Sequence, residues 1–154
     1  MEGEAFLIGI AQIGIVVAGF AGLAASFQDR TRWDHAEWVT LQTLVVASLA
    51  VVFFALLPFI PFYAWHDEQL SLRLASGGYA LYAVQVFVRR ILALRRRGSP
   101  RSAYRFLILG PFLQLSAIAN VAFGSMALYA VTLVLALYFS TTQFRHFVIP
   151  SERL

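Results

Sequence analysis

The sequence predicts an all-α integral membrane protein folded as a five-helix transmembrane bundle, with the N-terminus outside and the C-terminus in the cytoplasm. Composition is the first reason: of 154 residues, 60% are hydrophobic and 13% are charged, whereas a water-soluble domain carries about a quarter charged residues. The second reason is that the hydrophobic residues form five long segments with short polar links. The third is that nearly all basic residues fall on one side of such a bundle.

The first two segments are long enough to cross a bilayer, because a hydrocarbon core of about 30 Å needs about 20 helical residues. We expect the first span at about residues 5–27 and the second at about 38–65. Pro58 and Pro61 lie near the far end of the second span. Since proline lacks a backbone donor, these prolines predict a bend. Trp65 then marks a membrane boundary, where indole rings favour the headgroup region.

The third and fourth segments differ in how clearly they span. The third is expected at about residues 68–97, with its arginine-rich end projecting from the membrane. The fourth, at about 103–122, is interrupted by Gly110 and Pro111. A proline inside a helix removes a hydrogen bond and invites a break. A re-entrant fourth helix, with four full spans, is therefore the alternative to five spans.

The fifth segment follows a short link. Ser125 is a suitable N-cap residue for a helix at about residues 126–147. The shortness of the link predicts an antiparallel hairpin with the fourth segment. The five segments together make residues 1–154 a single transmembrane domain.

The arginines indicate the orientation. All 12 basic residues are arginine, and short arginine-rich loops stay in the cytoplasm. Five spans place eleven arginines on one side and only Arg73 on the other. A re-entrant fourth segment would move Arg145 and Arg153 across, giving nine against three. We therefore prefer five spans. The use of arginine for every basic residue indicates a bacterial source, and hence the inner (plasma) membrane of a bacterium.

A basic cluster follows the third apolar segment. It consists of Arg89, Arg90, Arg95, Arg96, Arg97 and Arg101. Such a cluster attracts anionic lipid headgroups at about 1 kcal/mol per charge near the surface, so we expect lipid contact there. Fixing the topology is the alternative role. Because the charge lies beside hydrophobic spans, we expect no nucleic-acid partner.

Catalytic chemistry has little support. The absence of cysteine excludes disulfides, thiolate chemistry and cysteine-based metal sites. Residues 34–37 and 66–68 combine histidine with carboxylates and could bind a metal ion or transfer protons. Asp34 with Glu37 matches a capping box, however, and Asp67 suits the start of a helix. We expect helix capping at both clusters, and no catalytic residue, metal site, cofactor or enzymatic activity.

Small residues recur along the first span and form a stripe with a step of four. The stripe consists of Gly14, Ala18, Gly22 and Ser26. It predicts close packing of two helices, within one chain or between copies. A small-residue face can also line a narrow pore. Gln12 would then be a polar group in the pore, and Glu4 would form a ring at its outer mouth.

Polar side chains also occur at membrane depth in the later segments. They are Gln42, Thr43, Gln85, Gln114, Asn120, Thr132 and Gln143. Because lipid offers no hydrogen-bond partner, most should bond between helices. Gln114 and Asn120, next to the break expected at Gly110-Pro111, also resemble an interrupted helix that lines a cavity. With Glu4 and Gln12 they are the candidates for a polar path.

Three short runs resemble small multi-span membrane proteins of bacteria. They read IAQI at residues 10–13, VAGFAG at 17–22 and QFR at 143–145. The resemblance covers two helices. It implies a multi-span membrane protein and no particular activity.

The functional hypothesis is a homo-oligomeric channel or pore for small ions or solutes, because five short-looped helices leave no room for a large cavity in one chain. An accessory or scaffold subunit of a larger membrane complex is the alternative, consistent with the small size and the basic face. An intramembrane enzyme comes third and rests on the histidine clusters alone.

Overall fold

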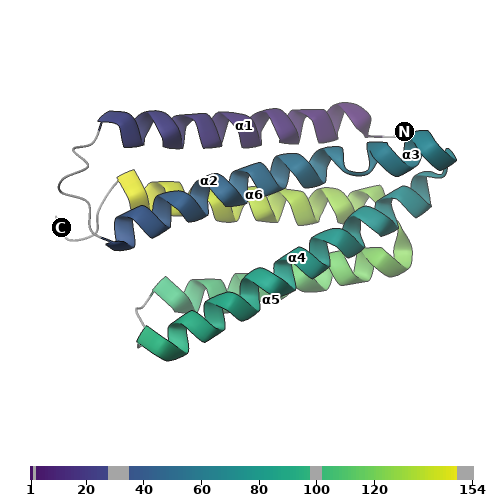
Figure 1. The fold of residues 1–154 in the computed structure, drawn as a ribbon. Helices are drawn as coiled ribbons and strands as arrows, with labels where there is room; N and C mark the ends of the chain where they lie inside the picture. The colour runs from purple at the N-terminus through teal and green to yellow at the C-terminus, as the bar shows by residue number, and fades with distance from the viewer. Residues whose placement is uncertain (2, 28–34, 98–101, 149–154) are drawn as a thin grey trace. The chain divides into compact units, whose positions relative to one another are not determined.

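The computed structural model describes residues 1, 3–27, 35–97 and 102–148. Within these ranges the chain is entirely helical outside its short connections, which confirms the all-α class (Figure 1). The helices are α1 (Glu4–Phe27), α2 (His35–Leu56), α3 (Phe59–Trp65), α4 (Glu68–Arg97), α5 (Ser102–Phe123) and α6 (Met126–Val148). They occupy the five expected segments, because α2 and α3 together fill the second.

The helices belong to two compact units. The first comprises Met1–Glu2 and Leu57–Thr132, which include α3, α4, α5 and the start of α6. The second comprises Gly3–Leu56 and Leu133–Leu154, which include α1, α2 and the rest of α6. Each unit has its own packing and is described separately.

In the second unit α1 and α2 lie side by side and run in opposite directions (Figure 1). The buried residues of α1 are Leu7, Ile10, Ala11, Gly14, Ala21 and Ala25. Those of α2 are Leu41, Leu44, Ser48, Val51, Phe54 and Ala55. Both sets contain positions spaced alternately three and four residues apart, the heptad spacing that keeps one helix face on its partner. Leucine and alanine dominate this contact, so the two backbones approach closely.

The second apolar segment departs from a regular helix at its prolines, where the sequence predicts a bend, and the structure has two separate helices there. α2 ends at Leu56, and Pro58 occupies the N-cap position of α3. The helical hydrogen-bond pattern resumes in α3, where Phe62 N donates to Pro58 O at 3.2 Å. α3 ends at Trp65, and the C-cap residue His66 has a left-handed backbone (φ 55°) and donates its N–H to Phe62 O at 2.8 Å.

Asp67 caps α4, which confirms the expected role of this carboxylate. Leu70 N donates to Asp67 Oδ1 at 2.9 Å, and Ser71 N donates to Asp67 O at 3.1 Å. Capping by Asp satisfies amides that lack a partner in the first turn. The other expected cap, at residues 34–37, lies outside the described side chains.

The break expected at Gly110-Pro111 is absent: α5 runs through Pro111 as one helix. Proline costs a helix one hydrogen bond and crowds the preceding turn, but its φ of about −65° is already helical. Packing against a neighbouring helix, here α4, can support the backbone around such a proline. The idea of a broken, cavity-lining helix here was therefore wrong.

Gly124 allows the tight turn between α5 and α6. Its φ is +63°, a left-handed backbone value that residues other than glycine rarely adopt. A Cβ at this position would lie 2.9 Å from Gln69 O and 3.1 Å from Arg73 Nε. Its N–H donates to Asn120 O at 2.8 Å and ends α5. Ser125 then holds the N-cap position expected for it, directly before α6.

Candidate functional site

α1 and α2 approach each other closely at Gly14. A Cβ on Gly14 would lie 2.8 Å from Val52 Cγ2 and 3.1 Å from Ser48 O. Real Cβ atoms essentially never lie under 3.0 Å from a neighbour. A side chain at this position would therefore force Val52 or the helix backbones to shift, and the backbone of α1 packs directly against Val52 and the backbone of Ser48.

The rest of the predicted small-residue stripe turns away from this contact. Ala18 is half-buried, whereas Gly22 and Ser26 are exposed. The cause is geometric, because each residue turns an α-helix by about 100° and a step of four leaves a drift of about 40°. From Gly14 to Ser26 the drift adds up to about 120°. The stripe thus begins on the α2-facing side of α1 and ends on its exposed side.

The exposed side of α1 carries a face on which polar and small residues alternate with two isoleucines. At about 100° per residue its members fall within an arc of about 80° along the whole helix. This outward face consists of Glu4, Ile8, Gln12, Ile15, Gly19, Gly22 and Ser26, all exposed. A Cβ added at Gly19 or Gly22 would meet nothing within 4 Å. The outward face thus unites the two α1 pore candidates with the exposed half of the small-residue stripe.

Asn120 has a different environment, at a buried junction in the first unit. Its Nδ2 donates to Ser76 Oγ at 2.8 Å, and its Oδ1 accepts a hydrogen bond from Ser125 N at 2.7 Å. Asn120 is 0% exposed. One side chain therefore bonds α5 to α4 and also caps the first turn of α6.

Two further polar contacts continue this junction along the first unit. Thr132 Oγ1 donates to Ser116 Oγ at 2.9 Å and connects α6 to α5. Gln114 Nε2 donates to Ala83 O at 3.4 Å and connects α5 to α4. We call Ser76, Gln114, Ser116, Asn120 and Thr132 the polar seam. Because its members bond to one another or to the backbone, the seam can hold three helices in register.

The four polar-path candidates are divided between the two units. Glu4 and Gln12 lie on the outward face of α1 in the second unit, while Gln114 and Asn120 belong to the polar seam of the first. Gln114 is partly buried, and Asn120 already uses both ends of its amide. The exposed candidates are therefore the two on α1.

Of the predicted lipid-facing arginines, the structure describes the side chain of Arg89, which is exposed on α4. Arg90, Arg95, Arg96 and Arg97 belong to the same helix, but their side chains lie outside the described part, as does Arg101 altogether. Arg73, assigned by the sequence to the opposite side, is exposed and lies beside Gly124.

Residues 66–68 act in local structure. His66 ends α3, Asp67 caps α4 and Glu68 begins α4. Over the described ranges, no group of three histidine or carboxylate side chains could hold a metal ion.

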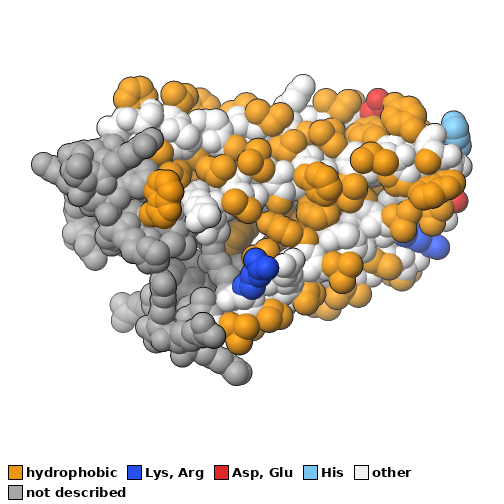
Figure 2. Space-filling view, viewed as in Figure 1, with side chains coloured by type: hydrophobic (Ala, Val, Ile, Leu, Met, Phe, Trp, Pro, Cys, Tyr) orange, Lys and Arg blue, Asp and Glu red, His pale blue; other side chains and the backbone are white. Residues whose placement is uncertain are grey.

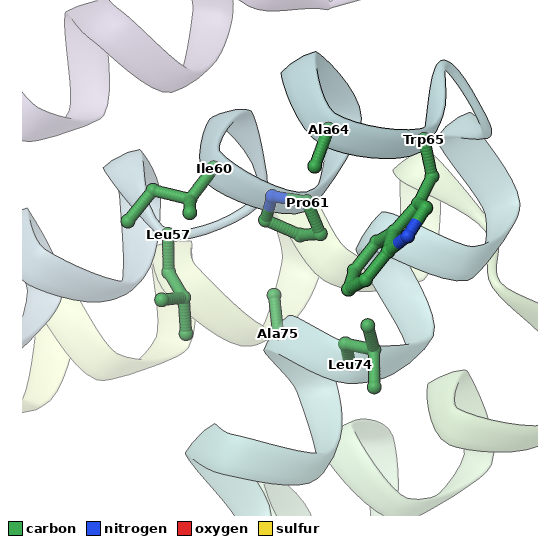
Figure 3. A pocket seen from close by; sticks show the side chains of 7 residues that line it. All are labelled: Leu57, Ile60, Pro61, Ala64, Trp65, Leu74 and Ala75. Carbon is green, nitrogen blue, oxygen red and sulfur yellow. The ribbon is translucent and has the colours of Figure 1, made fainter.

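A shallow apolar hollow lies between α3 and α4 in the first unit (Figure 3). Its volume is about 290 Å³. The lining residues are Leu57, Ile60, Pro61, Ala64, Trp65, Leu74 and Ala75. No charged side chain lines it, so it offers apolar contact rather than catalysis.

Sequence reasoning missed two parts of these sites. Ser76, the partner of Asn120, lies among small residues in α4 that resemble ordinary packing positions. Ile8, Ile15 and Gly19 complete the outward face of α1. Counting alternate steps of three and four, rather than four alone, would have found them, since that spacing follows one helix face.

Comparison with known proteins adds no relative: the chain matches no protein-family model, no curated protein and no solved structure.

Proposed function

We propose that the protein spans the membrane five times, with its N-terminus outside, and assembles from several copies into a channel for small ions or solutes. In this assembly the outward face of α1 lines the central axis. The channel requires a membrane-embedded chain, a face suited to an axis and a polar path along it.

The distribution of apolar residues supports the membrane location. By length and composition, Glu4–Phe27 and Leu41–Trp65 could each cross a bilayer. Core helices of soluble proteins meet the same criterion but are mostly buried, whereas here 28% and 33% of the respective apolar windows are buried. Phe27 is 86% exposed and Leu81 is 74% exposed. Figure 2 shows hydrophobic side chains over most of the visible described surface, far beyond the patches usual on a soluble monomer.

The proposed orientation follows from the arginines. Eleven of the twelve fall on the side assigned to the cytoplasm, as expected for the inner membrane of a bacterium. The described Arg89 is exposed, so its guanidinium can reach anionic headgroups by extending along the helix. Anionic lipids are thus proposed partners of the basic cluster.

The outward face of α1 is the observation that carries the channel proposal. A helix face that meets only lipid gains nothing from glycine, which costs about 0.5–1 kcal/mol relative to alanine. A carboxamide facing hydrocarbon without a partner costs several kcal/mol. Gly19, Gly22 and Gln12 are nevertheless exposed on this one face. We therefore expect water, another copy or a helix of a different protein to cover them.

Rotational symmetry would turn this face into a path. Each residue of the face becomes a ring when copies are arranged about an axis. Glu4 would form an acidic ring at the outer mouth, Gln12 a polar ring within, and Ile8 and Ile15 apolar constrictions. Acidic rings favour cations, and apolar constrictions gate by excluding water. The proposed permeant species are therefore small cations.

The experiment is ion flux through purified protein reconstituted in liposomes. We expect cation flux that falls when Gln12→Leu removes the polar ring, and reduced cation preference with Glu4→Gln. Gln42→Leu is the matched control, because Gln42 is an exposed glutamine on α2 rather than on the outward face. Absence of flux across ion types and voltages, or equal effects of Gln12→Leu and Gln42→Leu, would sink the proposal.

An accessory subunit of a larger complex is the second candidate. The open space above Gly19 and Gly22 also suits a closely packed helix from a different protein. Native mass spectrometry of the complex extracted in mild detergent separates the two proposals. A uniform homomer supports the channel, whereas stoichiometric recovery of a second polypeptide supports the accessory role.

A further inference from the structure

The hollow between α3 and α4 is a groove that arises from the way the two helices begin. The helix break before Pro58 starts α3 as a separate short helix next to α4. Figure 3 shows the ring of Pro61 facing Ala75 across the hollow, while Trp65 reaches toward Leu74 and closes one end. Because Ala64 and Ala75 have short side chains, the space between the two helices stays unfilled.

The chemistry of the lining determines what can occupy the groove. Every lining side chain is hydrocarbon except for the indole N–H of Trp65. The groove has a volume of about 290 Å³, close to the lower limit of the volumes of small-molecule sites, which are about 300–1,000 Å³. Ile60 is 69% exposed and Leu74 is 49% exposed, so the groove is open along its side. An open, narrow and apolar groove fits a flexible hydrocarbon chain that continues beyond it.

One end of the groove is polar. Directly after Trp65 come His66, Asp67 and Glu68, where α4 begins. Asp67 uses Oδ1 to accept from Leu70 N, and its side chain is exposed. The carboxylates at this end repel anionic headgroups and attract ammonium groups. The position of a Cβ on Gly124 is 3.1 Å from Arg73 Nε and 2.9 Å from Gln69 O, so this guanidinium also lies near the start of α4. The two carboxylates of Asp67 and Glu68 still outnumber this one positive charge.

We propose that the groove binds one acyl chain of a membrane phospholipid whose headgroup carries an ammonium group, with that headgroup beside Asp67 and Glu68. The proposal rests on the membrane location in the proposed function, and not on conduction. Trp65 lies between the acyl chain and the headgroup, the level that indole rings favour in bilayers. The site differs from the cytoplasmic arginine cluster, which selects anionic lipids.

Trp65 makes the site measurable, because brominated acyl chains quench tryptophan fluorescence on contact. The chain has three tryptophans, so Trp33→Phe with Trp38→Phe leaves Trp65 as the reporter. This variant is reconstituted in unlabelled phosphatidylcholine with increasing brominated phosphatidylethanolamine. We expect half-maximal quenching at about threefold lower mole fraction than with brominated phosphatidylglycerol, the selectivity of one weak surface charge pair. Glu68→Gln should reduce this difference.

Filling the groove provides the second readout. Ala75→Leu should weaken quenching by the preferred lipid and make it follow the bulk lipid fraction, while Ala64→Leu tests the same prediction from α3. Equal quenching by both lipids, unchanged in the filled variants, would overturn the proposal. So would protein that fails to float with the vesicles, which also removes the membrane location. Selective quenching without ion flux would support this site and reject the channel alone.

Discussion

Asn120 Nδ2 in α5 donates to Ser76 Oγ in α4 at 2.8 Å, and both residues are at most 1% exposed. Asn120 Oδ1 also accepts from Ser125 N. Asn120→Leu would leave Ser76 and the Ser125 amide without these partners. We expect a loss of about 2 kcal/mol in the free energy of unfolding, more than the ~0.6 kcal/mol typical of one interhelical bond in a membrane.

Thermal unfolding in mild detergent, followed by circular dichroism, measures this loss. Ser76→Ala is the matched variant, because it removes one of the two hydrogen bonds and should cost less. Equal stability of Asn120→Leu and the unaltered protein would show that the polar seam does not hold the first unit together.

Gly14 and Gly9 should respond in opposite directions to alanine. The Cβ of Gly14→Ala would lie 2.8 Å from Val52 Cγ2, and overpacking of this kind costs about 1–3 kcal/mol. A Cβ at Gly9 meets nothing within 4 Å, so Gly9→Ala should gain about 0.5–1 kcal/mol from helix propensity. Adding Val52→Ala should recover part of the Gly14→Ala loss. Equal effects of the two alanines in the unfolding assay would contradict the α1–α2 contact.

Gly124→Ala tests the turn between α5 and α6. An alanine at φ +63° is strained by about 1–2 kcal/mol, and its Cβ would lie 2.9 Å from Gln69 O. We expect a clear drop in unfolding temperature. Gly77→Ala is the control in the same unit, because its Cβ makes only an ordinary contact of 3.9 Å with Val121 Cγ2. Equal unfolding temperatures for Gly124→Ala and Gly77→Ala would contradict the left-handed turn at Gly124.

Ser48 offers a contrasting prediction. Its side chain is fully buried, and its Oγ has no hydrogen-bond partner within the described residues. A buried hydroxyl without a partner costs about 1–3 kcal/mol. Ser48→Ala should therefore keep or raise the unfolding temperature, whereas Ser76→Ala lowers it. A loss on Ser48→Ala would mean that its hydroxyl has a partner in the folded protein.

Local signals predicted the helical segments well. Pro58 and Pro61 indicated a bend in the second segment, and the structure has a break between α2 and α3 there, because Pro58 cannot continue the hydrogen bonding of α2. Asp67 caps α4 as its position before a helix indicates. The break predicted at Pro111 was wrong, because the effect of a proline on a helix depends on packing against other helices, which the sequence of one segment does not show.

The arrangement of the candidate sites was harder to predict from the sequence. Which helix faces α1 depends on tertiary packing, so the sequence did not show that Gly14 meets Val52 while Gly22 is exposed. The bond between Asn120 and Ser76 joins residues 44 apart in sequence, a distance over which periodicity carries no information. Orientation across the membrane and conduction stay predictions.

The most direct test of the channel is cysteine accessibility during ion flux, made simple by a chain without cysteine. Gln12→Cys and Gly19→Cys lie on the outward face of α1. Their neighbours Ile13 and Phe20, 51% and 59% exposed, point about 100° away and provide the matched variants Ile13→Cys and Phe20→Cys. We predict that a charged thiol reagent blocks flux through the first pair and spares the second. Equal block in both pairs, or no block at Gln12→Cys and Gly19→Cys, would contradict a pore lined by α1.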